Sequence, residues 1–317
     1  MSDDGAALGA RLRERDLGAA PAALNLLESS TAADREQSAA LLREVSPAAL
    51  GGEAPAHIVG VTGPPGVGKS TMLSALLAHW RAAGRSVAML AIDPSSRRSG
   101  GSLLGDRARI DFDPSDRGVL IRSTAAGVRL GGLAWPTRAA ASALGAAFDV
   151  VVIETVGVGQ AETEVADVAD TVAVVVQPGS GDVLQFLKAG IMETPDVLVV
   201  TKADLGDIAL RTRRDLSAAL RSLGSRATKV VAVSSLPPPT GIDELAAALE
   251  EHRAGTDIPA RRLAARRAGA LTEFALEHGE HGLRALGGRG AAVRLLAEQD
   301  PGLQTPDLVA RLEAGLA

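Results

Sequence analysis

The sequence of 317 residues has no cysteine. This absence excludes disulfide bridges, thiolate zinc sites and cysteine nucleophiles. Tyrosine is also absent, and aromatic residues make up only 2% of the chain. The core must therefore consist mainly of alanine, valine, leucine and isoleucine, which suits a fold in which helices pack closely on a sheet.

Long apolar runs and an excess of positive charge are missing as well. No apolar stretch reaches the length of a membrane span, and the first residues do not combine a basic start with an apolar run. We therefore expect a cytoplasmic protein with no membrane partner. The formal net charge is -5, and acidic and basic residues are interspersed. Because contacts to phosphates need a basic face, we expect no nucleic-acid partner.

The stretch 57–71, HIVGVTGPPGVGKST, combines an apolar, β-branched start with a glycine-rich turn. It is a full match to the phosphate loop of nucleoside-triphosphate-binding proteins and predicts a strand, a turn and a helix start. Glycines allow backbone N–H groups and the helix N-terminus to converge on a phosphate. The Lys69 ammonium would meet the β and γ oxygens, and the Ser70 hydroxyl would ligate Mg²⁺. The expected nucleotide-binding residues are Gly63, Pro64, Pro65, Gly66, Val67, Gly68, Lys69, Ser70 and Thr71.

Strand and helix patterns alternate from residue 57 to about residue 252. Near-continuous apolar runs such as 150–153 and 172–176 are typical of strands that are buried on both faces. We therefore expect an α/β fold of the P-loop NTPase type, with a mostly parallel sheet, helices on both faces, and helical extensions at both ends. The expected strands are 57–62, 86–92, 118–123, 148–154, 171–177, 196–201 and 229–234. The expected helices between them are 69–83, 136–146, 182–190, 208–223 and 241–252.

An acidic residue ends the second expected strand. Asp93 is followed by a loop rich in serine, glycine and arginine that leads to Asp106. Beside a phosphate site, such a loop can hold Mg²⁺ through aspartate and neutralise phosphate through arginine. We interpret it as a switch; the alternative is a mobile hydrophilic loop in which Asp93 caps a turn.

The strand expected at 148–154 ends in Glu154, followed by Thr-Val-Gly157. Nucleotide hydrolases place at this point an acid that holds Mg²⁺ through water and a glycine whose N–H meets the γ-phosphate. In Ras-like enzymes a water-orienting glutamine directly follows that glycine, but here Val158 has that position and Gln160 comes two residues later. Because valine cannot orient water, we expect slow intrinsic hydrolysis.

The sequence Thr201-Lys202-Ala203-Asp204 follows another expected strand and resembles the guanine-reading N/T-K-x-D motif. An aspartate can accept two N–H donors from guanine, whereas adenine offers no such pair. The lysine stem would pack on the base plane. The segment Ser234-Ser235-Leu236 ends the next strand and could offer backbone N–H groups to the guanine oxygen. We therefore expect GTP or GDP as the ligand.

With these motifs, the chain resembles the MeaB/ArgK family of SIMIBI-class P-loop GTPases, which act as chaperones of adenosylcobalamin-dependent acyl-CoA mutases. The resemblance extends from about residue 24 to about residue 255. Its segments are GPPGVGKST at 63–71, DPSSRRSGGSLLGDRARI at 93–110, ETVGVGQAETEVAD at 154–167 and QPGSGDVLQFLKAGIMETPD at 177–196. The chain departs from the family at Arg98, Arg107, Thr201 and Pro237–Pro239.

The resemblance implies that Lys69 and Ser70 bind phosphate and Mg²⁺, and that Lys188 lies on a third mobile segment. It also implies a metal-linked switch cluster of Asp93, Asp106 and Glu154, a homodimer, and a mutase of the methylmalonyl-CoA type as partner. The expected function is a GTP-hydrolysing switch that gates cofactor loading or protection of the mutase. The expected domains are an N-terminal helical extension (1–55), a P-loop GTPase domain (56–255), and a C-terminal helical dimerisation or interaction segment (256–317).

Two other functions have to be weighed. A nickel-type metallochaperone GTPase would usually carry histidine or cysteine ligands, but the chain has no cysteine and only five histidines. We interpret His278 and His281 as surface residues at a helix end, and the arginine pairs 261–262 and 266–267 as parts of a solvated helix face. An ATP-dependent kinase of a transport system would need a base near an acceptor hydroxyl, for which the sequence shows no convincing site.

Overall fold

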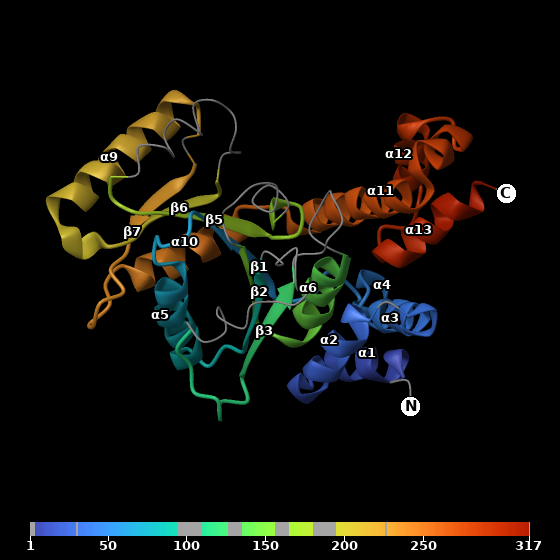
Figure 1. Ribbon diagram of the computed structural model, residues 1–317, viewed down its shortest axis with the longest axis horizontal. Helices are drawn as coiled ribbons and strands as arrows, with labels where there is room; N and C mark the ends of the chain where they lie inside the picture. The colour runs from blue at the N-terminus through green and yellow to red at the C-terminus, as the bar shows by residue number, and fades with distance from the viewer. Residues whose placement is uncertain are drawn as a thin grey trace, which may run out of the picture. The chain divides into compact units, whose positions relative to one another are not determined.

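The computed structural model describes residues 4–29, 31–93, 110–125, 135–155, 165–179, 195–225 and 227–316. The chain divides into two compact units (Figure 1). One, here called the sheet unit, comprises 57–134 and 149–256; the other, the helical unit, comprises 1–56, 135–148 and 257–317. The segment 135–148 thus groups with the two chain ends, although the sequence placed it in the GTPase domain. The three functional domains themselves stay a prediction.

The sheet unit contains seven parallel strands in the order β3-β2-β4-β1-β5-β6-β7. Four of them, including β1 and β4, are buried at every position. β-Branched residues fill such strands because both faces pack against apolar side chains. The strands are β1 (His57–Thr62), β2 (Val87–Asp93), β3 (Val119–Ala125), β4 (Val150–Thr155), β5 (Thr171–Val176), β6 (Val197–Val200) and β7 (Lys229–Ala232).

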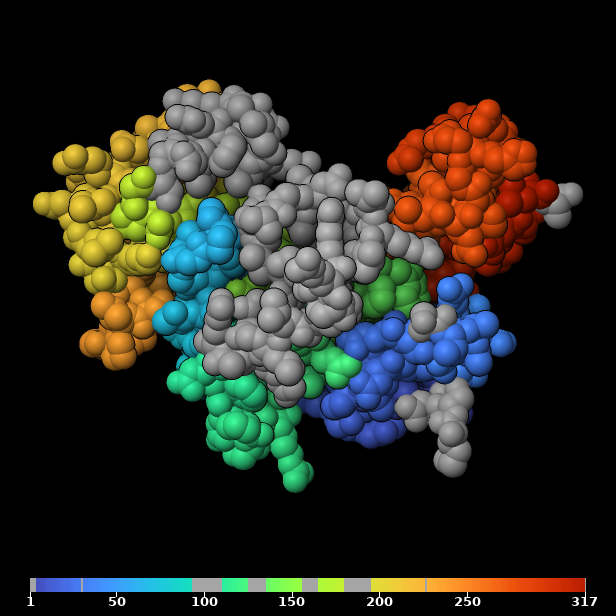
Figure 2. All heavy atoms as spheres, viewed as in Figure 1, coloured from blue at the N-terminus to red at the C-terminus, as the bar shows by residue number. Residues whose placement is uncertain are grey.

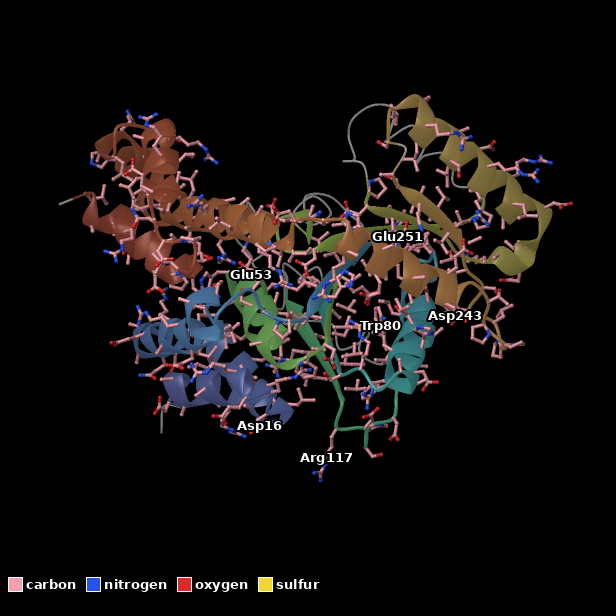
Figure 3. The ribbon with its side chains drawn as sticks, turned by 180° about the vertical axis from the view of Figure 1, so that it is seen from behind. Asp16, Glu53, Trp80, Arg117, Asp243 and Glu251 are labelled. Atoms are coloured by element: carbon pink, nitrogen blue, oxygen red, sulfur yellow. The ribbon has the colours of Figure 1, made fainter. Side chains whose placement is uncertain are left out.

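Helices cover both faces of this sheet. Helices α5 (Lys69–Ala82) and α10 (Ile242–Ala254) share one core with the strands, in which Trp80 of α5 is almost fully buried (Figure 3). Helix α9 (Asp207–Ser222) lies against β6 and β7 on the side away from α10 (Figure 1). A short 3-10 helix, η3 (Ala203–Leu205), precedes α9.

The predicted α/β fold with a parallel sheet is confirmed, and all seven predicted strands are present with slightly different ends. The predicted helices that became α5, α6, α9 and α10 are confirmed as well. The helix predicted at 182–190 lies outside the described residues. No helix in the described part of the chain is both long and apolar enough to cross a membrane.

The helical unit begins with helices that pack through small residues. A Cβ on Gly5 would come within 1.9 Å of Gln37 O, and one on Gly9 within 2.6 Å of Leu41 O, so the first and third helices approach closely. In its described residues, the predicted N-terminal helical extension contains four α-helices and a 3-10 turn. These are α1 (Gly5–Arg13), η1 (Leu17–Ala19), α2 (Ala20–Glu28), α3 (Ala32–Glu44) and α4 (Pro47–Leu50), and α1–α3 contact α6 (Trp135–Ala147).

The C-terminal helices α11 (Ile258–Ala285), α12 (Arg289–Ala297) and α13 (Thr305–Ala314) have a core of their own. In Figure 2 they take the colours at the orange-red and red end of the bar. Phe274 and Leu312 are fully buried in this core. Gly279 has φ 60° and ψ -164° and interrupts α11. Because this left-handed backbone is accessible mainly to glycine, the residue marks a genuine break in the helix.

The interpretation of the arginine pairs as a solvated face is wrong for Arg262 and Arg266. Arg262 is 6% exposed and donates hydrogen bonds of 2.7 Å to Ala54 O and Ala56 O. Arg266 forms a two-pronged pair with Glu53 at 3.0 and 2.8 Å. Such forked contacts are the strong form of an arginine interaction. They join the start of α11 to the segment that precedes β1.

A chain of polar side chains lies at the amino-terminal end of β1 and β5. His57, which is fully buried, has Nε2 2.8 Å from the Thr171 hydroxyl, and that hydroxyl is 2.9 Å from His252 Nδ1. Thr171 has one hydroxyl proton, so at least one of the two histidines must donate to it. Burial lowers the pKa of His57. The other His57 nitrogen lies 3.5 Å from Glu250 Oε1, which also accepts from Arg85.

Glu250 makes the stability of the sheet unit sensitive to acid. Its hydrogen bonds with His57 and Arg85 lower its pKa from 4.5 to about 2, against the opposing effect of burial. Because the folded-state pKa is depressed, ionised Glu250 stabilises the fold fully above about pH 4.5, and this contribution is lost as the pH falls toward about 2.

We expect the free energy of unfolding to fall more steeply between about pH 5 and pH 3 in the wild type than in Glu250→Gln, measured by urea unfolding at each pH. Glu251 lies beside it on α10, is exposed and pairs with Lys229 (Figure 3). Glu251→Gln is the control and should keep the wild-type dependence. Equal slopes for Glu250→Gln and the wild type would contradict this role.

Candidate functional site

The phosphate loop joins the end of β1 to the start of α5 and follows a path that only glycine allows. Gly63 has φ 145°, and a Cβ there would come within 2.1 Å of Val175 O at the end of β5. Gly66 and Gly68 have φ 77° and 99°. The left-handed Gly68 is the residue before α5, so the backbone turns directly into the helix N-terminus. This geometry fits a loop whose N–H groups face an anion.

Lys69 is held over the loop from the first turn of α5. Its side chain is mostly buried, and Nζ donates to Gly63 O at 2.6 Å and to Pro64 O at 3.0 Å. Backbone carbonyls of the loop thus hold the ammonium against the loop. A compact cation in this position can bind phosphate oxygens.

Ser70 and Glu154 meet beside the loop. Glu154, near the end of β4, is 6% exposed, and its Oε1 lies 3.5 Å from the Ser70 hydroxyl. Two ligands at neighbouring positions around Mg²⁺ are about 3 Å apart, because each lies about 2.1 Å from the ion. A hydroxyl and a carboxylate at this separation therefore fit the hard oxygen ligands that Mg²⁺ needs.

The segment Thr201–Asp204 is tied directly to the phosphate loop. The Thr201 hydroxyl lies 2.5 Å from Val67 O and 3.0 Å from Val176 O. Lys202 Nζ donates to Gln177 Oε1 at 2.6 Å and lies 3.5 Å from Gly66 O. The threonine at this position, which departs from the family, therefore bonds to the loop backbone itself.

Asp204 is exposed, and its carboxylate is oriented from the neighbouring strand end. Ser234 Oγ donates to Asp204 Oδ1 at 2.9 Å and accepts from the Leu236 N–H at 3.3 Å. The Ala203 N–H also donates to Val233 O at 3.1 Å. These bonds bring the predicted base-reading segment and the Ser234–Leu236 segment together.

The structure thus brings most of the predicted nucleotide-binding residues to one edge of the sheet, around the ends of β1, β4 and β6. Their roles toward a ligand stay predictions. Of Asp93 only the backbone, at the end of β2, is described. The other predicted switch residues lie outside the described residues: Asp106, Gly157, Gln160 and Lys188.

Three contributors to the site were missed by the sequence analysis. Gln177 accepts a hydrogen bond from Lys202, and the carbonyl oxygen of Val175 leaves no room for a side chain at Gly63. The buried hydroxyl of Thr155, next to Glu154, has no hydrogen-bond partner among the described residues. A glutamine directly after an apolar strand was the available signal for Gln177, but a backbone carbonyl such as that of Val175 leaves no sequence signal.

Comparison with known families decides the identity. Residues 20–279 match the family described as methylmalonyl Co-A mutase-associated GTPase MeaB. The chain belongs to the MeaB family. A relative from Pyrococcus abyssi, whose given name is that of a GTPase, is 42% identical over 251 residues, which are 77% of this chain and 74% of the relative.

Two further similarities agree with membership of the MeaB family. The mouse protein named methylmalonic aciduria type A homolog, mitochondrial, is 43% identical over 157 residues, 49% of this chain and 38% of the relative. The crystal structure of a LAO/AO transport system kinase has 27% identity and a TM-score of 0.65, and the match covers 99% of this chain and 98% of that one. This MeaB-family chain is a P-loop GTPase.

The approach of Gly63 to β5 provides a test of the loop geometry. Gly63→Ala adds a Cβ that overlaps Val175 O, so we expect it to lower the free energy of unfolding by about 2–5 kcal/mol and to abolish nucleotide binding. Gly66→Ala is the matched control, because nothing lies within 4 Å of its Cβ position. Its strained φ should lower stability by only about 1–2 kcal/mol.

Thermal and urea unfolding of both variants, with nucleotide binding measured by isothermal titration calorimetry, checks this expectation. If Gly63→Ala were as stable as Gly66→Ala and bound nucleotide normally, the close approach to Val175 O would not be what requires glycine at position 63.

Proposed function

We propose that this GTPase is a switch that acts as a chaperone of an adenosylcobalamin-dependent acyl-CoA mutase of the methylmalonyl-CoA mutase type. The observation that carries the proposal is the match over residues 20–279 to a family described as mutase-associated GTPases. The name of the mouse relative, which refers to methylmalonic aciduria, supports the same class of partner. The GTPase would gate loading or protection of the cofactor, act as a homodimer, and work in the cytoplasm.

In this proposal the phosphate loop 63–71 holds the triphosphate, with Lys69 at the β and γ oxygens. Mg²⁺ would be held by Ser70, Glu154, Asp93 and Asp106, and would neutralise charge on the phosphates. The 3.5 Å separation of Ser70 Oγ and Glu154 Oε1 supports the first two ligands. Thr201, Lys202, Asp204 and the segment 234–236 would read guanine.

The switch residues complete the proposal. The N–H of Gly157 would meet the γ-phosphate, and Gln160 and Lys188 would belong to segments that respond to its presence. Loss of the γ-phosphate would remove contacts that hold segments 93–110 and 155–166 in place. Since Val158 stands where a water-orienting glutamine would be, the intrinsic rate should be no higher than on the order of 10⁻⁴ per second.

A kinase of a transport system is the second candidate, because the solved structure that covers nearly the whole chain carries that title. The geometry around Asp204 favours the GTPase over an ATP-dependent kinase. Ser234 orients its carboxylate, and Thr201 of the same segment bonds to the phosphate loop, which supports a role for Asp204 as the acceptor for two N–H donors of a bound base. Adenine would leave this acceptor without its second donor. A nickel-type metallochaperone has less support, since the chain lacks cysteine.

The base-reading role of Asp204 predicts a change of specificity. Xanthine carries an oxygen where guanine carries its amino group, so an asparagine amide can donate to that oxygen and accept from the ring N–H. Asp204→Asn should therefore bind GTP ~100-fold more weakly and bind XTP more tightly than the wild type does. Fluorescent-nucleotide displacement measures both affinities.

Asp207→Asn is the control for Asp204→Asn, because Asp207 is also exposed but begins α9 outside the motif. It should keep the wild-type preference for GTP. Unchanged GTP affinity in Asp204→Asn, or equal wild-type affinity for ATP and GTP, would contradict guanine reading by Asp204 and favour the kinase.

The partner is tested by complex formation. The purified chain and a candidate adenosylcobalamin-dependent mutase should associate with affinities that differ by ~10-fold between GDP and a non-hydrolysable GTP analogue, as measured by analytical ultracentrifugation. Ser70→Ala, which removes a proposed Mg²⁺ ligand, should remove the difference between the two nucleotides. The absence of any complex with the mutase in either nucleotide state would contradict the chaperone proposal.

A further inference from the structure

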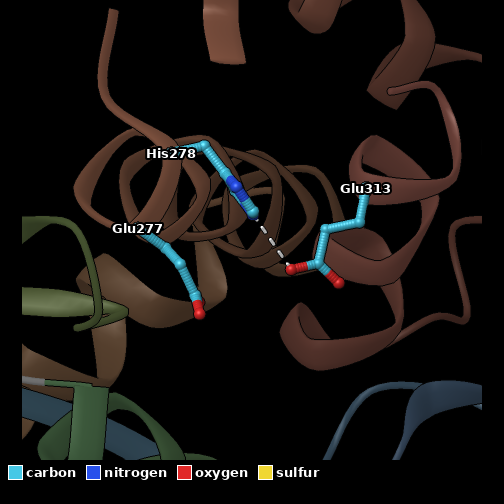
Figure 4. Close-up of side chains that lie close together, drawn as sticks. All are labelled: Glu277, His278 and Glu313. Carbon is cyan, nitrogen blue, oxygen red and sulfur yellow. Dashed lines mark hydrogen bonds and ion pairs between the residues drawn. The ribbon is translucent and has the colours of Figure 1, made fainter. Parts of the chain in front are cut away.

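Three side chains that offer metal-ligating atoms meet in the helical unit. Glu277 and His278 lie on α11 and Glu313 lies on α13, and one ligand atom from each lies within 4.8 Å of the other two (Figure 4). Among the histidine, cysteine, aspartate and glutamate side chains of the described residues, these three form a group that could hold one ion. None of the three belongs to the nucleotide site.

The imidazole of His278 is oriented by its neighbours. Its ring centroid is 4.6 Å from that of Phe274, one turn earlier on α11, and Nε2 donates to Glu313 Oε1 at 3.1 Å. Phe274 is fully buried in the core of the C-terminal helices, so it gives the ring a rigid support. The His278 side chain is 28% exposed, so solvent and ions reach part of it.

The break in α11 explains why the three residues are close together. Gly279 follows His278 directly, and after it the chain folds back so that a Cβ on Gly282 would come within 2.4 Å of His278 Cβ. The imidazole is therefore enclosed by Phe274 on one side and by the returning chain on another. Glu313 approaches from α13, which contacts α11 along this core.

One imidazole nitrogen and two carboxylate oxygens are a donor set suited to Zn²⁺ and similar ions. Ligands that lie about 2.0–2.1 Å from a tetrahedral ion are about 3.3 Å apart. The 3.1 Å between His278 Nε2 and Glu313 Oε1 is close to that value. Glu277 is exposed, and a rotation of its side chain would complete a three-ligand site with a fourth position for water.

We propose that Glu277, His278 and Glu313 bind one divalent transition-metal ion of the Zn²⁺ type, and that this ion links α11 to α13. The ion takes the place of the Nε2 proton of His278, which passes to solvent. Mg²⁺ is not the ion, since it prefers oxygen ligands and keeps much of its water. The site is independent of the proposed chaperone function.

The existing ion pair between His278 and Glu313 is the competing explanation of the cluster. That pair needs no third residue, whereas the metal site requires Glu277. Glu277→Gln therefore separates the two explanations, because it removes a ligand and leaves the His278–Glu313 contact in place. His281, which is exposed and lies outside the cluster on the same helix, offers a matched control.

The test is Zn²⁺ titration of the full-length, nucleotide-free chain in competition with a chromophoric chelator. We expect one Zn²⁺ per chain, and at least ~10-fold weaker binding in each of Glu277→Gln, His278→Ala and Glu313→Gln. His281→Ala should bind as the wild type does. Thermal unfolding in EDTA shows whether each variant is folded, and Zn²⁺ should raise the midpoint only in the wild type and the His281 variant.

Substitution by Co²⁺ adds a direct readout of coordination. Visible absorption bands should appear when Co²⁺ is added to the wild type. The same bands should appear in His281→Ala and should be absent in His278→Ala and Glu313→Gln. The proposal is overturned if Zn²⁺ binding is absent, if either Glu277→Gln or Glu313→Gln binds Zn²⁺ as tightly as the wild type, or if His281→Ala is the variant that loses it.

Discussion

Gly63 lies so close to Val175 O that no side chain fits between them, and this contact fixes the phosphate loop on the sheet. The loop leaves β1, which pairs with β4 on one side and β5 on the other. Because β1 is central, the loop, Glu154 at the end of β4 and Val175 at the end of β5 converge on one edge. The carboxyl edge of a parallel sheet is where α/β proteins bind ligands.

From that edge, hydrogen bonds connect the phosphate-binding and base-reading parts of the site. Thr201 and Lys202 reach the carbonyls of Val67 and Gly66, and Ser234 orients Asp204. A base bound at Asp204 and a phosphate bound at the loop therefore contact segments that are directly bonded to each other. This arrangement would let one GTPase fold position the proposed guanine-reading residues relative to the phosphates without a separate base-binding domain.

Local patterns predicted those parts of the structure that local physics determines. The run 150–153 is typical of a strand buried on both faces, and the spacing from Gly63 to Ser70 indicates a loop and a helix start. Long-range partners could not be predicted in this way. Arg262 and Arg266 look like surface charges in sequence, yet they bond to the chain just before β1, more than 200 residues away. His278 meets Glu313 only because Gly279 interrupts α11.

The central claim is that this MeaB-family GTPase is a slow switch whose turnover responds to an acyl-CoA mutase. The most direct test is steady-state hydrolysis of GTP and ATP by the purified chain, alone and with a candidate adenosylcobalamin-dependent mutase, with Lys69→Ala as the inactive control. We expect slow hydrolysis of GTP and not of ATP, faster turnover with the mutase, and none in Lys69→Ala. Hydrolysis of both nucleotides at equal rates, or several GTP turnovers per second without a partner, would contradict this claim.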